Sequence, residues 1–509
     1  MNAKRLRSTT ISSLLLILLT TGTAFAQSSA SIYSGIEKGD FRQGYGSSSL
    51  WKMGAEAHTA GYFYNGRTYL NGSFSFEEMH GKDMMNSMFI NPGYYPINVL
   101  EFTPGDKTLQ TYRFSGGIRQ TVAQSWQIGG TIDFASQNYA KRKDIRHTNY
   151  ALDLTVAPEI RYMTPNWTSF GLSAVFRKTS EYIEAEQVGA ATADTYMAFF
   201  DKGLDYGTLQ AWDGAGIHLA EAGVSRLPVR EFSYGIETHF AQSQWGLKTD
   251  ISYLRTSGFV GEKGYDWYRF PGHKVVADAS WRKRWDGGWT SSLSFLFGWR
   301  GQRLEESVID KVTSGGVSLP VVYAWNLVSR RRQTEFAPTL KLAPDAGFVR
   351  NIRIGYSCFL NDEQVAPQYP YTDRWHLAMH RIHGAFTFVL PDAGIWSRFA
   401  LTLGGRIHWA SDYEQGLESV IPSASVIPSE AKESLTPVTQ PTRLTSDWIR
   451  KREYLTASAA GLNAALRYDI AALKGLFVSI DASWLHAYRI QYLNGKNRYT
   501  ANIRLGYDF

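Results

Sequence analysis

The sequence predicts an all-β fold, a transmembrane antiparallel up-and-down β-barrel of about 18 strands, with about 16 as the alternative count. Three observations predict it. Apolar and polar residues alternate with a period of two, tight turns alternate with long loops along the chain, and the last alternating segment ends on an aromatic residue.

The alternation comes in segments of about ten residues, the length that crosses a membrane as a tilted strand. In residues 126–134, Trp126 and Ile128 share one face, whereas Gln127 and Asp133 share the other. Three further segments repeat this pattern, at 289–299, 399–409 and 499–509. A soluble β-sandwich alternates as well, so the connections between the strands must decide between the two folds.

The connections alternate between tight turns and long polar loops. Outer-membrane barrels have this asymmetry, with short turns in the periplasm and long loops outside the cell. The tight turns are expected near residues 65–66, 124–125, 242–244, 286–288, 344–347 and 391–394, and the long loops at about 80–108, 182–230, 301–331 and 411–452.

Tryptophans recur at the short-turn ends of the expected strands. An indole ring has an apolar body and an N–H that seeks water, so a membrane interface selects a ring of them at one level. The alternative is a set of tryptophans scattered through a protein core. The residues expected to form this belt are Trp126, Trp167, Trp245, Trp285, Trp289 and Trp396.

The chain ends with Tyr507-Asp508-Phe509. A terminal aromatic residue that completes an alternating strand resembles the signal read by the barrel-assembly machinery. We therefore expect Tyr507 and Phe509 to form a C-terminal assembly signal, with that machinery as a partner during biogenesis.

The strand count depends on the N-terminal segment. The clear segments begin near Leu50 and number about 17, whereas bacterial single-chain barrels have even counts. Residues of about 29–37 are the candidate for one further strand. The alternative is that this segment folds into the lumen as a small plug.

The first 26 residues have the features of a secretory signal peptide. Lys4, Arg5 and Arg7 precede an apolar run at 11–19, and a small-x-small cleavage site follows at 24–26. The run is too short to cross a bilayer as a helix, which needs roughly 20 residues. Residues 27–509 are therefore the expected mature barrel, and its expected location is the cell outer membrane.

Composition excludes several other classes. Aromatic residues reach 14 %, yet the mean hydropathy is −0.27, because a barrel has apolar residues only at every second position. The 53 Lys and Arg exceed the 46 Asp and Glu by 7, and by 4 without the three signal-peptide cations, which does not indicate a nucleic-acid partner. The single Cys358 excludes an internal disulfide.

Several stretches of the N-terminal third are similar to one known family. They are Gly39-Asp40-Phe41 before Trp51-x-x-Gly54, the region EEMHGKDMMNSMFINPGYYP at 77–96, and the run 111–117. They resemble an uncharacterised family of outer-membrane β-barrels from Bacteroidota, a domain of unknown function. The loop at 143–146 is similar to an Asp/Arg turn of that family but lacks its prolines. The resemblance implies fold and location, and no biochemical role.

The inward face of the later strands is rich in arginine. Guanidinium groups there would attract anions and bind carboxylate or phosphate through pairs of parallel hydrogen bonds. The alternative is a lumen packed with salt bridges that hold the barrel rigid. The residues expected to line the lumen as anion contacts are Arg353, Arg381, Arg398, Arg406, Arg498 and Arg504, joined by His383 and His408, with Asp469 and Asp481 as the inward acids.

Signatures of catalysis are missing from the sequence. It contains no His-Glu-x-x-His, Gly-x-Ser-x-Gly or Gly-Lys-Ser/Thr motif. His380 and His383 lie three apart, so on a strand they face opposite sides and cannot chelate one metal ion together. We therefore expect no enzyme, no cofactor, no metal and no catalytic residues.

Three functional hypotheses follow. The first is a porin-like solute-transport or accessory uptake barrel for an unknown small solute, with a mild anion preference. The second is a sealed, surface-exposed binding or partner barrel. The third is an outer-membrane hydrolase with its site at the rim. Outer-membrane lipid is an expected partner in each case, and nucleic acid in none.

Overall fold

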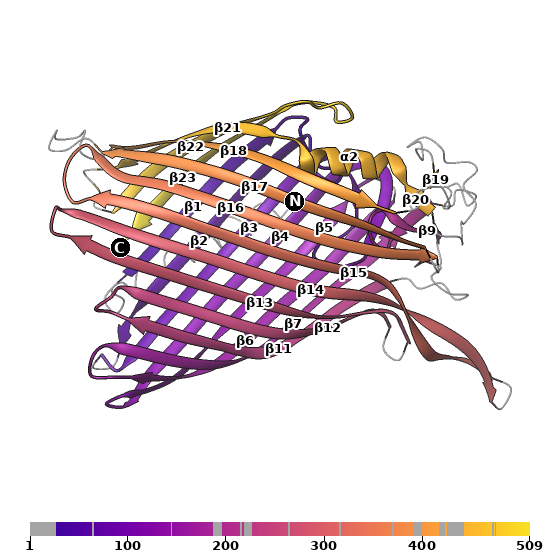
Figure 1. The fold of residues 1–509 in the computed structure, drawn as a ribbon, viewed down its shortest axis with the longest axis horizontal. Coiled ribbons are helices and arrows are strands. Elements are labelled where there is room, and N and C mark those ends of the chain that lie inside the picture. Colours follow the sequence, from indigo (N-terminus) through magenta and orange to yellow (C-terminus); the bar gives the residue numbers. More distant parts are fainter. Residues whose placement is uncertain are drawn as a thin grey trace, which may run out of the picture.

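The computed structural model describes residues 27–63, 66–143, 145–186, 196–213, 216–217, 226–262, 265–314, 317–368, 371–389, 399–416, 423–424, 442–470, 473 and 475–509. Among these residues, 18 antiparallel strands close a single barrel (Figure 1). The expected signal peptide lies outside the described residues and stays a prediction.

The wall strands follow one another around the barrel in chain order. They are β1 (Gln27–Lys38), β2 (Ser49–Phe63), β3 (Thr68–Ser87), β4 (Asn98–Ala123), β5 (Trp126–Lys141), β6 (Arg146–Met163), β7 (Thr168–Glu186), β11 (Arg226–Gln242), β12 (Leu247–Glu262), β13 (Tyr265–Trp285), β14 (Trp289–Ser314), β15 (Val317–Pro344), β16 (Val349–Gln368), β17 (Tyr371–Val389), β18 (Phe399–Gln415), β21 (Ala459–Asp469), β22 (Leu476–Ala487) and β23 (Asn497–Asp508).

Strand β1 closes the barrel. It pairs with β2 on one side and with β23 on the other, in a register that runs from Ser29 opposite Asp508 to Lys38 opposite Tyr499. The predicted count of about 18 and the predicted N-terminal strand are thus confirmed, and the plug alternative is wrong.

The outer face of the wall is apolar. Large side chains at alternate positions, such as Ile132, Ile251, Leu293, Ile354 and Ile503, are 41–53 % exposed and point away from the lumen. Such a continuous apolar exterior is stable only in lipid. The protein is therefore an outer-membrane barrel. In the described part of the chain, no helix is long and apolar enough to cross a bilayer.

The two ends of the barrel differ. Tight turns and the C-terminus lie at one end, and α2 (Thr445–Thr456) with the long connections lies at the other (Figure 1). The turn between β13 and β14 is an example: Gly288 has a φ of +76° and donates its N–H to Trp285 O at 3.1 Å. By the rule for bacterial barrels, this end faces the periplasm. The predicted turn at 391–394 lies outside the described residues.

All four expected long loops are more ordered than the sequence suggested. Wall strands occupy both ends of 80–108 and of 182–230, because β3 and β7 end later, and β4 and β11 begin earlier, than expected. The expected loop at 301–331 is wrong, because β14 and β15 continue to pair as far as Ser314 opposite Val317. Their hairpin projects beyond the other strands (Figure 1). The expected loop at 411–452 contains β19 (Ser423–Ala424), β20 (Thr442–Leu444) and most of α2.

Candidate functional site

The candidate site is the lumen together with the segments that fold into its extracellular mouth. On β16–β18, Arg353, Arg381 and Arg406 point into the lumen, because the residues next to them, such as Ile354 and Ile382, are exposed on the outer face. We call these three arginines the lumen arginine cluster. They are the predicted anion contacts that the structure brings together.

Cross-strand pairing places more basic groups beside the cluster. Arg381 is the register partner of His408, and Arg406 that of His383. Arg353 is paired with Lys341 of β15, a residue that the sequence analysis did not single out because it precedes the arginine-rich segment. In the part of the chain that the structure describes, no ion pair joins the cluster to an acidic residue.

The other predicted lumen arginines differ. Arg498 forms an ion pair with Glu37, and Arg504 forms one with Glu56. Their charges are thus largely neutralised. Arg398 lies outside the described residues.

Elsewhere the lumen wall carries salt bridges, as in the alternative hypothesis of a lumen whose ion pairs hold the barrel rigid. Arg177 pairs with Asp153, and Glu159 lies 3.1 Å from Arg119. The two predicted inward acids also have partners: Asp469 lies 2.9 Å from Arg467, and Asp481 accepts a hydrogen bond of 2.7 Å from Asn502. Other acids that face the lumen have no ion pair in the described structure, among them Asp133, Asp278 and Glu335. Charges of opposite sign are therefore partly segregated around the wall.

The extracellular mouth is filled by a cap of inward-folded segments. Its first part is the loop 88–97 between β3 and β4, whose Met88 and Phe89 are 0 % and 2 % exposed. They pack in an apolar core with inward side chains of the wall, among them Phe270 and Leu304. Apolar burial of this kind holds the loop inside the barrel.

Polar side chains of the wall also hold this loop. Arg331 donates to Gly93 O at 2.8 Å and to Tyr94 O at 3.1 Å. Glu231 accepts a hydrogen bond of 2.7 Å from the Tyr94 hydroxyl. Buried polar groups that are fully paired fix one arrangement, so the wall and the loop form one unit.

The second part of the cap is a hairpin of β8 (Tyr196–Asp201) and β9 (Tyr206–Asp213). Strand β8 pairs with the start of β4, and β20 pairs with β9. The short strand β10 (Gly216–Ile217) extends the hairpin by pairing with β9.

Helix α2 is the third part. Trp448 is 2 % exposed and packs edge-on against Trp375 of the inner wall, with ring centroids 5.0 Å apart. Arg452 forms ion pairs with Asp412 and Glu414, both inward residues of β18. The helix is therefore fixed to the inside of the barrel.

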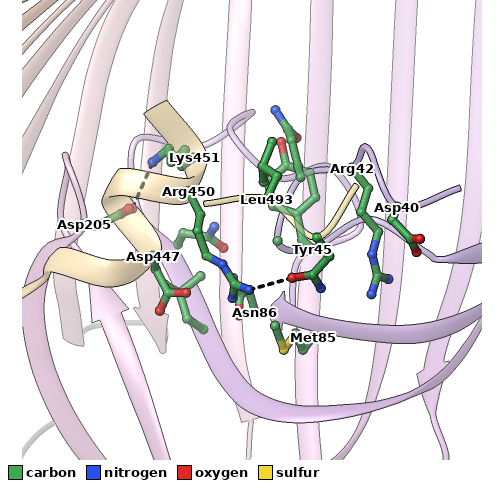
Figure 2. A pocket seen from close by; sticks show the side chains of 15 residues that line it. Asp40, Arg42, Tyr45, Met85, Asn86, Asp205, Asp447, Arg450, Lys451 and Leu493 are labelled. Carbon is green, nitrogen blue, oxygen red and sulfur yellow. Dashed lines mark hydrogen bonds and ion pairs between the residues drawn. The ribbon is translucent and has the colours of Figure 1, made fainter. Parts of the chain in front are cut away.

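A pocket lies within the cap where α2 meets the neighbouring loops (Figure 2). Lys451 Nζ donates to Asp205 Oδ1 at 2.9 Å, and Arg450 donates to Asn494 Oδ1 at 3.1 Å. Burial and the nearby Asp205 carboxylate raise the pKa of Asp447 to about 6. The pocket thus combines charges of both signs.

The described residues of the predicted belt lie at the same end of the barrel, where the tight turns are. They lie at the short-turn ends of their strands and are 42–68 % exposed: Trp126, Trp167, Trp245, Trp285 and Trp289. Trp396 lies outside the described residues. At the C-terminus, the rings of Tyr507 and Phe509 are 4.6 Å apart, and Phe509 N donates to Ser28 O. The roles of these residues stay predictions.

The two histidines considered as a metal pair lie on opposite faces. His380 stacks on Trp409 outside the barrel, with centroids 5.4 Å apart, whereas His383 faces the lumen arginine cluster. Within the described ranges, no group of three His, Cys, Asp or Glu residues is placed to hold a metal ion.

The sequence analysis missed most of the cap. One signal was available: Met88-Phe89-Ile90 and Tyr94-Tyr95 are apolar runs inside a stretch expected to be a polar loop. A loop in water rarely carries such runs, so they indicate a buried segment. The helix has a weaker signal, since Trp448 is one of few apolar residues in it.

Comparison with known proteins gives a family. The model of a family described as a family of unknown function (DUF6850) matches residues 17–509. No curated protein sequence matches the chain. Among solved structures, the chain is similar to the outer membrane transporter YddB from Escherichia coli, at 8 % identity and a TM-score of 0.45, over 96 % of this chain and 81 % of that chain. It is also similar to OccAB1 from Acinetobacter baumannii, at 11 % identity and a TM-score of 0.37, over 96 % and 98 % of the two chains.

Proposed function

The chain belongs to this family of unknown function, DUF6850, and we propose that it is a solute-transport barrel of the outer membrane with a mild preference for anions. In this proposal the polar lumen is the solute pathway, and the cap restricts entry from outside. The origin in Bacteroidota that the resemblance implies stays a prediction.

The lumen arginine cluster is the observation that carries the proposal. Arg353 and Arg381 are exposed inside the barrel, and no acid neutralises them among the described residues. Cations lining a water-filled passage with low-dielectric walls raise the local concentration of anions. The preference is mild because Asp133 and Asp278 face the same lumen from other strands.

Recording from purified protein in planar bilayers tests the proposal. Under a potassium chloride gradient, we expect the reversal potential of the wild type to be shifted toward the equilibrium potential of chloride. In the variant R353Q/R381Q/R406Q this shift should be lost. The matched control is R504Q/E56Q, which removes both partners of an ion pair and so leaves the net charge of the lumen unchanged. This variant should keep the wild-type reversal potential. Cation preference in the wild type, or an unchanged potential in the triple variant, would contradict the proposal.

The cap favours one second candidate, a sealed barrel that binds a partner at the cell surface. Its packed core, with side chains such as Met88 and Phe270 at 0 % exposure, resembles the interior of a soluble domain. Absence of conductance both in the wild type and after release of the cap would favour this candidate over transport. We propose no enzymatic activity.

A further inference from the structure

Four arginines form a patch on the outside of the barrel, near the extracellular ends of β13–β15. They are Arg269, Arg303, Arg330 and Arg332, and we call them the outer arginine patch. Their outward direction follows from their neighbours in sequence: Phe270 and Leu304 are 0 % exposed inside the barrel, and Arg331 reaches the inner loop 88–97.

The positive charge of the patch is poorly balanced. Arg303 and Arg330 are direct cross-strand partners, an arrangement in which like charges destabilise a sheet. Glu305 is shared between Arg269, at 2.5 Å, and Arg303, at 3.7 Å. Within the described residues, no ion pair is formed by Arg330 or Arg332.

The acid that lies opposite Arg332 on the neighbouring strand already binds another arginine. Asp362 is the register partner of Arg332 on β16. Its two carboxylate oxygens accept hydrogen bonds of 2.9 Å each from Arg374. The four guanidinium groups therefore have one carboxylate among them, that of Glu305, which is already shared by Arg269 and Arg303. An anion from outside the chain would relieve their repulsion.

The patch lies where lipid headgroups are expected. On β14, the outward apolar residues run from Trp289 to Trp299, about the ten residues that cross the hydrocarbon as a tilted strand. Arg303 comes four positions later. On β15, Leu340 and Phe336 face lipid, and Arg332 and Arg330 follow them toward the extracellular end.

A groove on the outer wall adjoins the patch. It is lined by Trp299, Arg332, Leu360, His376 and Tyr413, among others. Gly301, the register partner of Arg332, leaves space that the Trp299 ring covers, since a Cβ at Gly301 would lie 2.9 Å from that ring. The groove thus offers an apolar floor and, at Arg332, a cationic edge, which suits a molecule with an acyl chain and an anionic head. Asp362 also lines the groove, with its carboxylate bound by Arg374.

We propose that the outer arginine patch and this groove bind the phosphate groups of a phosphorylated glycolipid in the outer leaflet of the membrane. Arginine is suited to this role because its planar fork matches the geometry of a phosphate. The site is separate from the lumen, so the proposal does not rest on the transport function.

Native mass spectrometry of the purified protein in detergent tests the site, with diphosphoryl lipid A as the probe. The wild type should retain this lipid in preference to phosphatidylcholine. In R303Q/R330Q/R332Q, binding should be about 100-fold weaker, roughly fivefold for each cation removed. Arg332→Gln alone, at an exposed position, should weaken binding by about fivefold. This single variant still tests the site if the triple variant does not fold.

The matched control is R353Q/R381Q/R406Q, which removes the same charge from the lumen and should bind lipid A as the wild type does. The patch variant should in turn keep the wild-type reversal potential. The lipid-binding proposal and the transport proposal can therefore be contradicted separately. Equal retention of lipid A by the patch variant and the wild type would overturn the inference. So would binding of free inorganic phosphate as tight as that of the lipid, since the site would then take a soluble anion.

Discussion

The guanidinium of Arg331 in the barrel wall donates a hydrogen bond of 3.1 Å to the backbone oxygen of Tyr94, a residue 237 positions earlier in the chain. A second bond, of 2.8 Å, reaches Gln302 on the neighbouring strand. Through Arg331, the wall and the inward-folded loop share one buried polar network. The cap is therefore part of the folded barrel and not a loose extracellular loop.

Removal of this contact should loosen the cap and leave the barrel intact. Arg331→Ala deletes hydrogen bonds from a charged donor, so we expect the free energy of opening the loop 88–97 to fall by about 3 kcal/mol. Hydrogen exchange of the amides in 88–97 measures this change. Arg332→Ala, one residue away on the outer face, is the control and should leave exchange in the loop unchanged. Equal exchange in both variants would show that Arg331 does not hold the loop.

Acidic pH should stabilise the cap around α2. Burial and the Asp205 carboxylate raise the pKa of Asp447 to about 6 and that of Asp201 to about 7. An unfolded Asp titrates near about 3.9, so between about pH 4 and pH 7 the folded cap binds more protons than the unfolded one. Its stability must then fall as the pH rises through this window.

Hydrogen exchange of the α2 amides, corrected for the intrinsic rate, should show greater protection at about pH 5 than at about pH 8. Asp447→Asn removes one of the two groups and should flatten this dependence. Greater protection at the higher pH would contradict the assignment of buried, protonated carboxyls to this part of the cap.

The tryptophans at the periplasmic end should contribute to stability in lipid. Trp167 and Trp245 are 68 % and 67 % exposed in the turns before β7 and β12. If lipid covers them, each change to Ser should lower the free energy of unfolding in vesicles by about 1–2 kcal/mol. Urea titration of the vesicle-inserted protein measures this loss. An effect near zero for both variants would remove these two residues from the predicted belt.

The barrel could be predicted from sequence because each wall strand contacts mainly its two neighbours. Alternation in Trp126–Phe134 or Phe399–Trp409 reports locally which side chain faces lipid, so the barrel class and the inward residues of such strands can be predicted from it. The final strand count also needed the rule that bacterial single-chain barrels have even counts. In the structure Arg353, Arg381 and Arg406 face the lumen, the direction that the alternation predicts. Their role as anion contacts stays a prediction.

The cap could not be predicted in this way because its contacts join distant segments. Trp448 packs against Trp375, and the loop 88–97 is held by Arg331, although nothing near these residues in sequence specifies the partner. Pairing of Arg498 with Glu37 and of Arg504 with Glu56 depends likewise on closure of β23 against β1. Whether a lumen arginine has an acidic partner is thus a tertiary property.

The most direct test of a water-filled, positively charged lumen below a closed cap uses the single cysteine. Cys358 faces outward on β16, whereas the preceding Ser357 faces inward, opposite Arg381. In a Cys358→Ser background, Ser357→Cys moves the thiol by one residue from the lipid side to the lumen.

The rates at which small anionic and cationic thiol reagents modify this cysteine are then measured with vesicles of known orientation. We predict that the thiol at position 357 reacts from the periplasmic side at least about tenfold faster with the anionic reagent. From the extracellular side it should react slowly in the protein with an intact cap, and faster once Arg331→Ala loosens the loop 88–97. Equal rates for the two charges, or rapid reaction from outside with the cap intact, would contradict this account.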